Sequence, residues 1–302
     1  MSQSPTGSMR PALSIVVASV ESERNLPRAL HALDDAGDGT GAEVIVVDAS
    51  TDSSADIARS SHVPSMVIDR PPGTLTPHLW AEGIRRSSGR WIALTTGHCI
   101  VPRGWGTALV TTLEGGAAAA GAGLLPGRSL GTIDLAVFFL RYHTFIDLTA
   151  GDGRPVEEIP GDNAAYRGDD LRTVVTAPDS GFFEVEHHRE LRRRGEAIVA
   201  VPAATAHFGR SFPLATILRH RFEHGRRFGA WRTRVRGEHR LGLIAKAPLV
   251  PAVLWSRAWA NVKGTADLRR AFLRSSPLFL TLACAWAVGE AAGGLIGSPG
   301  DE

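Results

Sequence analysis

Cysteine is scarce in this chain, and neither sign of charge dominates it. Its 302 residues include only two cysteines, Cys99 and Cys284, so a disulfide framework is excluded and a reducing compartment is favoured. The formal net charge is +2, so any binding that charge drives must depend on local clusters. No apolar stretch of the signal-peptide kind precedes Ser14, and we therefore expect no cleaved leader.

What is present has the composition of an ordinary globular protein. Hydrophobic residues make up 43% of the chain and charged residues 21%, which argues against wholesale disorder. The length suits one large domain, or one domain with an appendage, and is enough to bury a sizeable core.

Arginine is concentrated between residues 187 and 240, a region that includes the run Arg192–Arg194 and the pair Arg226 and Arg227. Such a block suits phosphate, nucleic acid or an anionic membrane surface. No recognised nucleic-acid motif accompanies the arginines, and they lead into apolar segments. A membrane surface is therefore the better interpretation, and no nucleic-acid partner is predicted.

Short apolar runs and helical patterns alternate through the first hundred residues. Strands are expected at Leu13–Ser19, Ala42–Ser50, 65–70 and 90–96, and helices at 25–33, 50–60 and 77–89, the last closed by Gly89. The first two strands are apolar, β-branched runs, as strands buried on both faces are. This alternation predicts an open α/β sheet covered by helices on both faces.

Polar residues stand at the ends of three of these strands: Ser19 and the nearby Glu21, Asp48, and the stretch Thr96-Gly97-His98. In open α/β sheets ligands bind beyond the carboxyl ends of the strands. Each residue also has a plainer interpretation, since Ser19 and Asp48 suit turns or helix caps and a lone histidine is usually a hydrogen-bonding residue. Their convergence at one edge favours a nucleotide pocket.

Four blocks in this order resemble the family 2 glycosyltransferases, which are inverting enzymes of the GT-A fold. The blocks are "SIVVASVESERNLPRAL", "EVIVVDASTDSSADIA", "GIRRSSGRWIALTTGHCIVPRGW" and "IPGDNAAYRGDDL", and the similarity runs from about Leu13 to His207. The resemblance implies an open sheet flanked by helices, a nucleotide-sugar donor as co-substrate, and transfer to a saccharide or lipid-linked acceptor.

The resemblance also assigns roles to residues. It implies that Ser19, Glu21 and Asp48 hold the base and ribose of the nucleotide, and that Asp162 and Asn163 line the acceptor side. The segment "DSGFFEVEHHRELRRRG" resembles the one that carries the catalytic base, and Glu184 is its matching carboxylate.

The chain departs from the family where the diphosphate is bound. The usual Asp-x-Asp that binds a divalent cation, Mn2+ or Mg2+, is replaced by Thr95-Thr96-Gly97-His98, and both acids are lost. Three interpretations stay open. His98 and His207 hold a borderline metal, or Arg226 and Arg227 neutralise the diphosphate without a metal, or catalysis is lost. For the two arginines, a solvated or lipid-facing helix surface is an equal alternative.

The chemistry that the resemblance implies needs one base. A carboxylate removes the proton of the acceptor hydroxyl as it attacks the anomeric carbon, and the leaving diphosphate is stabilised electrostatically. Glu184 stands among Phe182, Phe183 and Val185, an apolar context that favours such a base. An exposed glutamate at a helix start is its alternative, with Asp179 and Glu186 as replacement bases.

The last seventy residues are apolar in two segments. Leu241–Val262 is interrupted by charges and prolines, whereas Ser276–Gly297 has the length of a bilayer span with one charge, Glu290. A basic loop is expected between them. If both segments spanned the membrane, this loop and the basic block before Leu241 would face opposite sides, against the positive-inside tendency. We expect one span with one interfacial segment, or two interfacial segments; a buried helical hairpin is the alternative. The helix expected at Ile133–Leu148 adds to the acceptor groove or to the core.

These patterns predict a flexible start at residues 1–12, a GT-A-like domain at 13–235 and membrane-associated helices at 236–302. They favour a glycosyltransferase on the cytoplasmic face of the membrane, where membrane lipids are further partners. A catalytically inactive relative that serves as a scaffold subunit for polysaccharide or glycolipid assembly is the rival hypothesis, because the acidic pair is missing.

Overall fold

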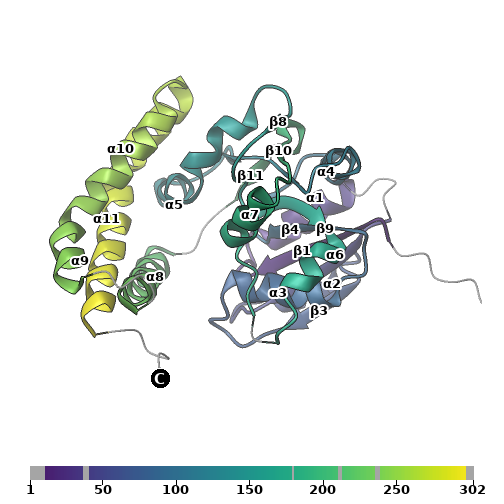
Figure 1. Cartoon of the computed structure of the whole chain (residues 1–302), viewed down its shortest axis with the longest axis horizontal. Helices are drawn as coiled ribbons and strands as arrows, with labels where there is room; N and C mark the ends of the chain where they lie inside the picture. The colour runs from purple at the N-terminus through teal and green to yellow at the C-terminus, as the bar shows by residue number, and fades with distance from the viewer. Residues whose placement is uncertain (1–10, 37–40, 179, 210–212, 235–238, 297–302) are drawn as a thin grey trace, which may run out of the picture. The chain divides into compact units, whose positions relative to one another are not determined.

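An eight-stranded mixed sheet flanked by helices forms the centre of the first of two units of the chain (Figure 1). The computed structural model describes residues 11–36, 41–178, 180–209, 213–234 and 239–296. By their internal contacts, residues 1–125 and 147–209 make the first unit, and residues 126–146 and 210–302 make the second. The strand order in the large sheet is β3-β2-β1-β4-β9-β6-β10-β8. Its strands are β1 (Leu13–Ser19), β2 (Glu43–Asp48), β3 (Met66–Asp69), β4 (Trp91–Thr96), β6 (Ala119–Gly121), β8 (Arg154–Pro155), β9 (Asn163–Arg167) and β10 (Ile198–Ala200).

The register of these strands brings several chain segments to one edge. The neighbours β3, β2, β1 and β4 are parallel, and Ser19 lies opposite Asp48 while Ala18 lies opposite Thr96. Strand β9 runs antiparallel to β4, so that its first residue, Asn163, pairs with Thr95. The carboxyl ends of β1, β2 and β4 and the start of β9 therefore share one edge, which we call the rim.

The core strands are buried because their side chains are apolar on both faces. All seven residues of β1 and all six of β4 are buried, as expected for strands covered on both sides. Helix α3 packs on β1 and β2, with Gly83 so close to Val16 that a larger side chain would overlap it. The helices and turns of this unit are α1 (Leu26–Ala36), α2 (Ser54–Ser60), α3 (Thr76–Arg86), α4 (Trp105–Glu114), α6 (Gly168–Val174), α7 (Glu184–Arg193) and η2 (Pro202–Ala204).

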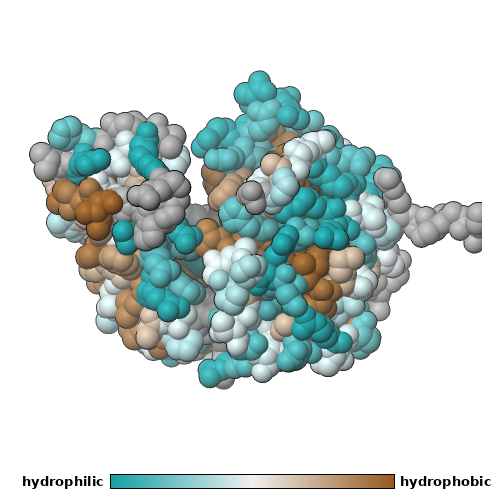
Figure 2. Space-filling view, turned by 90° about the horizontal axis from the view of Figure 1, so that it is seen from below, coloured by the Kyte–Doolittle hydropathy of each residue, from teal (hydrophilic) through white to brown (hydrophobic). Residues whose placement is uncertain are grey.

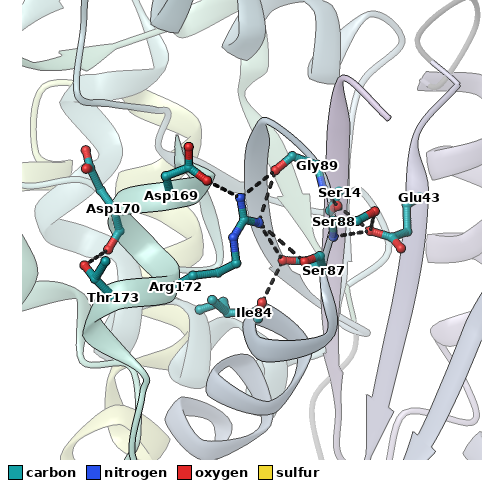
Figure 3. A network of polar contacts seen from close by, with 10 residues as sticks. All are labelled: Ser14, Glu43, Ile84, Ser87, Ser88, Gly89, Asp169, Asp170, Arg172 and Thr173. Atoms are coloured by element: carbon teal, nitrogen blue, oxygen red, sulfur yellow. Dashed lines mark hydrogen bonds and ion pairs between the residues drawn. The ribbon is translucent and has the colours of Figure 1, made fainter. Parts of the chain in front are cut away.

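A polar network closes the opposite edge of the sheet, where the parallel strands begin (Figure 3). Ser14 Oγ donates to Glu43 Oε2 at 2.5 Å and accepts from the Gly89 amide at 2.8 Å. Arg172 donates to the Gly89 carbonyl oxygen at 3.2 Å. The predicted helix closure at Gly89 is wrong, since α3 ends at Arg86. A glycine is needed at this position for another reason: a Cβ there would lie 2.6 Å from the Ser14 nitrogen.

A second, three-stranded sheet lies beyond the end of β4. Its order is β5-β11-β7, formed by β5 (Cys99–Ile100), β11 (Ala206–Phe208) and β7 (Leu124–Pro126). Strands β11 and β5 are antiparallel, so His207 lies opposite Ile100, and the Gly209 amide donates to the His98 carbonyl oxygen at 2.7 Å. This pairing fixes the backbone on both sides of His98.

The second unit is helical. Its elements are α5 (Thr132–Tyr142), α8 (Leu214–Arg234), α9 (Arg240–Lys246), η3 (Ala247–Leu249), α10 (Val250–Val262) and α11 (Ala266–Ile296), and η1 (His143–Thr149) runs from it into the first unit. Helix α11 begins ten residues before the apolar segment expected at Ser276, so the prediction of a basic loop is wrong. Arg269, Arg270 and Arg274 are helical, and Pro277 is accommodated inside the helix.

Helices α8 and α11 approach closely because glycines line both surfaces. Added Cβ atoms at Gly225 and Gly229 would overlap α11 backbone, and Cβ atoms at Gly289 and Gly293 would overlap the carbonyl oxygens of Phe222 and Arg226 on α8. The contacts advance in the same direction along both helices, which are therefore parallel. Small residues four apart permit such close packing in water and in lipid.

The division of the molecule differs from the expected boundary at residue 235. Helix α8 precedes that residue but packs on α11, and α5 also contacts α11, where Phe139 and Phe272 meet with ring centroids 5.2 Å apart. Both helices belong to the second unit because their apolar surfaces are buried against α11. The chain thus leaves the sheet unit at residue 126 and re-enters it at residue 147.

Helix α11 is long and apolar enough to cross a membrane, although buried core helices share these properties. It has 31 residues, and 44% of its most apolar 18-residue window is buried. Figure 2 shows apolar side chains gathered on the surface of the helical unit. Large exposed apolar residues of this unit are Phe228, Trp231, Leu249, Val253, Leu273, Leu280, Val288, Leu295 and Ile296.

Candidate functional site

Asp48 ends β2 at the rim and is held by the turn that follows it. Its Oδ1 accepts from the Ser50 amide at 2.9 Å and its Oδ2 from the Ser50 hydroxyl at 2.8 Å. The side chain is buried, with 3% of the residue exposed. The turn-forming role that the sequence allowed is therefore present, and it fixes the carboxylate at the strand end with lone pairs left on both oxygens.

Glu21 joins the turn after β1 to the turn after β2. Its carboxylate accepts from the amide and hydroxyl of Thr51 at 2.8 and 2.9 Å, and its own amide donates to the Ser50 hydroxyl at 2.8 Å. Its backbone has a positive φ of 46°, an unusual conformation for a residue other than glycine. Such strain is kept where surrounding contacts hold it, so the two turns form one rigid corner of the rim.

Two hydroxyl groups on adjacent strands are buried without a hydrogen-bond partner among the described residues. They are Ser19 Oγ at the end of β1 and Thr95 Oγ1 near the end of β4. Buried polar groups in folded proteins are almost always paired, and exceptions often mark places that a ligand or water completes. The predicted nucleotide-binding residue Ser19 thus has hydrogen-bonding capacity to spare at the rim.

His98 is fixed by Asn25, from the turn that leads into α1. Asn25 Nδ2 lies 3.2 Å from His98 Nδ1, and both residues are largely buried. In this arrangement the amide donates to Nδ1, so a neutral imidazole carries its proton on Nε2. Gly97 makes room for this corner, since a Cβ there would lie 2.6 Å from Ser22 Oγ. His98 is therefore held in place at the end of β4.

These residues do not fit a divalent metal. Within the described part of the chain, no three His, Cys, Asp or Glu side chains come together as a metal-binding group. The strand end carries no carboxylate, which Mg2+ requires and Mn2+ favours. Asn25 engages Nδ1 of His98, so only Nε2 of this ring is left to face a cation. His207 lies in β11 and is exposed.

Glu184 is the first residue of α7 and turns its carboxyl group toward the turn before β9. A Cβ on Gly161 would lie 2.9 Å from Glu184 Cδ and 3.1 Å from the Trp80 ring, so both side chains lie beside Gly161. Trp80 in turn donates from Nε1 to the Thr95 carbonyl oxygen at 2.9 Å. Through Gly161 and Trp80, the carboxylate is thus connected to the end of β4 at the rim. Of the two replacement bases, Glu186 is exposed and Asp179 lies outside the described residues.

Asn163 is a structural residue in this fold. Its amide nitrogen donates to the carbonyl oxygens of Ala122, Gly123 and Ala204 at 3.0 to 3.1 Å, and its Oδ1 accepts from Trp105 Nε1 at 2.7 Å. The side chain is completely buried. This geometry does not support the predicted acceptor contact, because every hydrogen atom of the amide is used to tie strand β9 to its surroundings. Asp162, beside it, is also buried, and its acceptor role stays a prediction.

Arg226 and Arg227 belong to α8 in the helical unit. Arg226 is half-buried, with its backbone against Gly289 and Gly293 of α11, while Arg227 is exposed. Their contact with a donor phosphate stays a prediction. Residues that sequence reasoning missed at the sheet unit's site are Asn25, Trp80 and Gly161. Each acts through neighbours distant in sequence, which leave no local pattern.

The sheet order, the rim and the carboxylate beside it define the chain as a GT-A glycosyltransferase fold. Residues 14–172, more than half of the chain, match the family model described as glycosyl transferase family 2. The chain belongs to this family. No curated protein sequence matches it.

Glycosyltransferases are among the solved structures to which this chain is similar. The first 349 residues of S. aureus TarS, also solved in complex with UDP, are 14% identical over 90% of each chain with a TM-score of 0.50. The mannosyltransferase PcManGT from Pyrobaculum calidifontis, in complex with GDP-Man and Mn2+, is 16% identical over 95% of this chain and 88% of that chain, with a TM-score of 0.48. At these identities the likeness concerns the fold alone.

Proposed function

We propose that this protein transfers a sugar from a nucleotide-sugar donor to a saccharide or lipid-linked acceptor, with Glu184 as the base. The observation that carries the proposal is the connection of the Glu184 carboxyl group, through Gly161 and Trp80, to the rim where Asp48 and Ser19 lie. A carboxylate beside a nucleotide pocket is what a single displacement at the anomeric carbon needs.

In the proposed reaction, the acceptor oxygen attacks the anomeric carbon of the donor sugar. The bond from that carbon to the diphosphate oxygen breaks, and its electron pair leaves with the nucleoside diphosphate. The acceptor proton passes to Glu184. Because Glu184 is half-buried and its carboxyl group lies against Gly161, water competes less for it than for an exposed carboxylate.

In this proposal, hydrogen-bond donors stabilise the negative charge that develops on the diphosphate. His98 stands at the end of β4, where relatives of the family have their acidic pair, and Ser19 Oγ and Thr95 Oγ1 add two hydroxyls that have no hydrogen-bond partner among the described residues. Fixed donors of this kind stabilise a leaving group without reorganising during the reaction.

Action at the cytoplasmic face of the membrane is the second part of the proposal. It is supported by the apolar length of α11, by large exposed apolar side chains such as Val288 and Leu295, and by arginines and lysines on the same unit. Apolar insertion together with basic contacts to anionic lipid is the usual combination for stable membrane attachment. An acceptor linked to lipid would then be presented at the surface where the enzyme is held.

Binding and turnover together test the enzymatic proposal. UDP and GDP binding is measured by calorimetry, and nucleoside diphosphate release is measured from a panel of UDP- and GDP-sugars with saccharide and polyprenyl-phosphate acceptors. Glu184→Gln is expected to keep nucleotide affinity within about twofold and to lower turnover by about 10²-fold or more, the usual weight of a general base.

Glu186→Gln is the matched control, since Glu186 is an exposed carboxylate on the same helix. It should leave turnover near the wild-type rate. Undiminished turnover in Glu184→Gln would remove that residue as the base. Nucleotide binding without turnover of any donor by the wild type would instead favour the inactive scaffold subunit, which the missing acidic pair motivates.

A further inference from the structure

A buried hydrogen bond joins helix α7, which carries Glu184 at its first position, to the sheet. Tyr166, on the neighbouring strand β9, places its hydroxyl 2.9 Å from His188 Nε2. Neither side chain is exposed to solvent. His188 follows Glu184 by four residues, so the two side chains lie on the same face of the helix, one turn apart.

Aromatic packing surrounds this bond on the sheet side. The Tyr166 ring is stacked on His188 with an interplanar angle of 25°, and it meets Phe182 and His187 edge-on with centroids 5.5 and 5.4 Å apart. Phe182 precedes the helix and His187 lies within its first turns. Tyr166 on β9 therefore holds the start of α7 through both a hydrogen bond and ring packing.

Tyr166 also interacts electrostatically with Glu184. Burial raises the pKa of the Tyr166 hydroxyl, and the negative charge of Glu184 raises it further. Burial lowers the pKa of His188 to about 3, with smaller contributions from His187 and Arg192. Both partners thus stay neutral across the range in which enzymes work, so the hydrogen bond does not change with pH.

Glu184 is the first residue of α7, so the position of the helix start sets the position of its backbone. Its carboxyl group lies against Gly161, and the neighbouring Phe183 and Val185 are exposed. A shift of about 1 Å in the base relative to the acceptor is enough to lower the rate about 10²-fold.

We propose that the Tyr166–His188 hydrogen bond is a positioning device that sets the direction of the Glu184 carboxylate toward the acceptor hydroxyl. The inference rests on the proposed function, since it assumes that Glu184 is the base. It assigns a role in transfer to two residues that touch neither donor nor acceptor. A neutral bond is suited to this task, because its geometry stays constant while the base gains and loses a proton.

The test compares Tyr166→Phe with the wild type, using the donor of the panel that the wild type turns over. We expect kcat per folded molecule to fall by about tenfold while the donor KM stays within about twofold, because the base loses its alignment and the nucleotide pocket does not. We also expect the acidic limb of the kcat–pH profile to shift, because Tyr166 interacts electrostatically with Glu184.

Two substitutions of His188 test whether the hydrogen bond to Tyr166 is what maintains kcat. His188→Gln keeps a side chain that can bond the tyrosine and should retain kcat within about threefold, whereas His188→Leu should lose as much as Tyr166→Phe. Ser14→Ala is the control for stability, because it removes a buried hydroxyl that bonds Glu43 and Gly89 at the far edge of the same sheet. It should lower the unfolding midpoint and leave kcat and its pH profile unchanged.

The outcomes distinguish a failure of the positioning role from a failure of the proposed function. If Glu184→Gln is inactive while Tyr166→Phe keeps both the kcat and the acidic limb of the wild type, the bond is merely structural and the positioning role is overturned. If Glu184→Gln remains active, Glu184 is not the base, and the proposed positioning role has nothing to act on. If Ser14→Ala lowers kcat as much as Tyr166→Phe does, the loss reflects general destabilisation, and the positioning role is again overturned.

Discussion

At the scale of single residues, the site is built from side chains whose role depends on what fixes them. Asp48 is anchored by Ser50, Glu21 by Thr51 and His98 by Asn25. The strand-end residues were predictable from sequence because polar residues after apolar runs stand out locally. Their partners were not, since nothing in the sequence around Asn25 indicates a histidine 73 positions away.

The first prediction concerns Asp48. Asp48→Asn keeps the shape of the side chain but loses its charge, and we expect UDP or GDP to bind about tenfold more weakly, the equivalent of one charge-assisted hydrogen bond. Calorimetry measures the change. Asp52→Asn is the matched control, because Asp52 also closes a turn, where it accepts from the Ser54 amide at 2.9 Å. Equal affinities for Asp48→Asn and wild type would contradict the assignment.

The second prediction concerns metal use. Because the donor set at the end of β4 does not suit a divalent cation, we expect Mn2+ or EDTA to change nucleotide affinity by less than about twofold. His98→Ala should weaken binding by about tenfold, because one hydrogen bond to a charged phosphate is lost. A large gain in affinity with Mn2+, abolished in His98→Ala, would show that the histidine is a metal ligand after all.

The third prediction concerns acid stability. Burial lowers the pKa of His188 to about 3, so below its usual value of 6.5 the unfolded chain binds a proton that the folded chain does not. Stability should therefore fall progressively as the pH drops from about 6.5 toward 3. Denaturant titrations at several pH values should show a smaller loss over this range for His188→Gln. An unchanged slope would mean that His188 is charged in the fold.

At the scale of helices and strands, the parallel strands matched expectation closely. Strand β1 occupies the expected Leu13–Ser19, because a β-branched apolar run has few other stable environments. The helices at the other end of the chain differed more. Helix α11 continues through a basic stretch and a proline, since burial of Leu268 and Phe272 rewards helix there more than local sequence signals oppose it.

The fourth prediction concerns the glycine contact between α8 and α11. Gly293→Ala adds a methyl group that overlaps the Arg226 carbonyl oxygen, so the helices must separate, and we expect a loss of about 1–3 kcal/mol. Thermal unfolding followed by circular dichroism measures it. Gly242→Ala is the matched control: it is also helical but meets no atom within 4 Å, and alanine there should stabilise slightly. Equal effects of the two changes would contradict the close packing.

At the scale of the whole molecule, the chain is a sheet unit with its own rim and a helical unit with its own apolar surface. Residues 126–146 leave the sheet unit to pack on α11, which joins a segment from the middle of the sequence to its last helix. The ion pair of Arg232 and Glu290 likewise joins α8 to α11 and accounts for the one acidic residue in the apolar segment.

The fifth prediction concerns the membrane. Val288 on α11 is 60% exposed, and Val288→Glu places a charge on the surface proposed to enter the bilayer. We expect flotation of the full chain with vesicles of phosphatidylcholine and phosphatidylglycerol to fall several-fold. Val174→Glu, at an exposed valine of the sheet unit, is the control and should float as the wild type does. Undiminished flotation of Val288→Glu would contradict membrane contact by this surface.

The sequence by itself determined the buried strands, the polar residues at their ends and the family to which the chain belongs. These features are local, because an apolar strand and its closing turn are written in consecutive residues. Only the tertiary structure decided that Asn163 is a structural tie, that Asn25 directs the proton of His98, and that Tyr166 holds the helix of Glu184. Those roles arise between residues far apart in sequence, and no periodicity within one segment specifies which strand or helix will lie beside it.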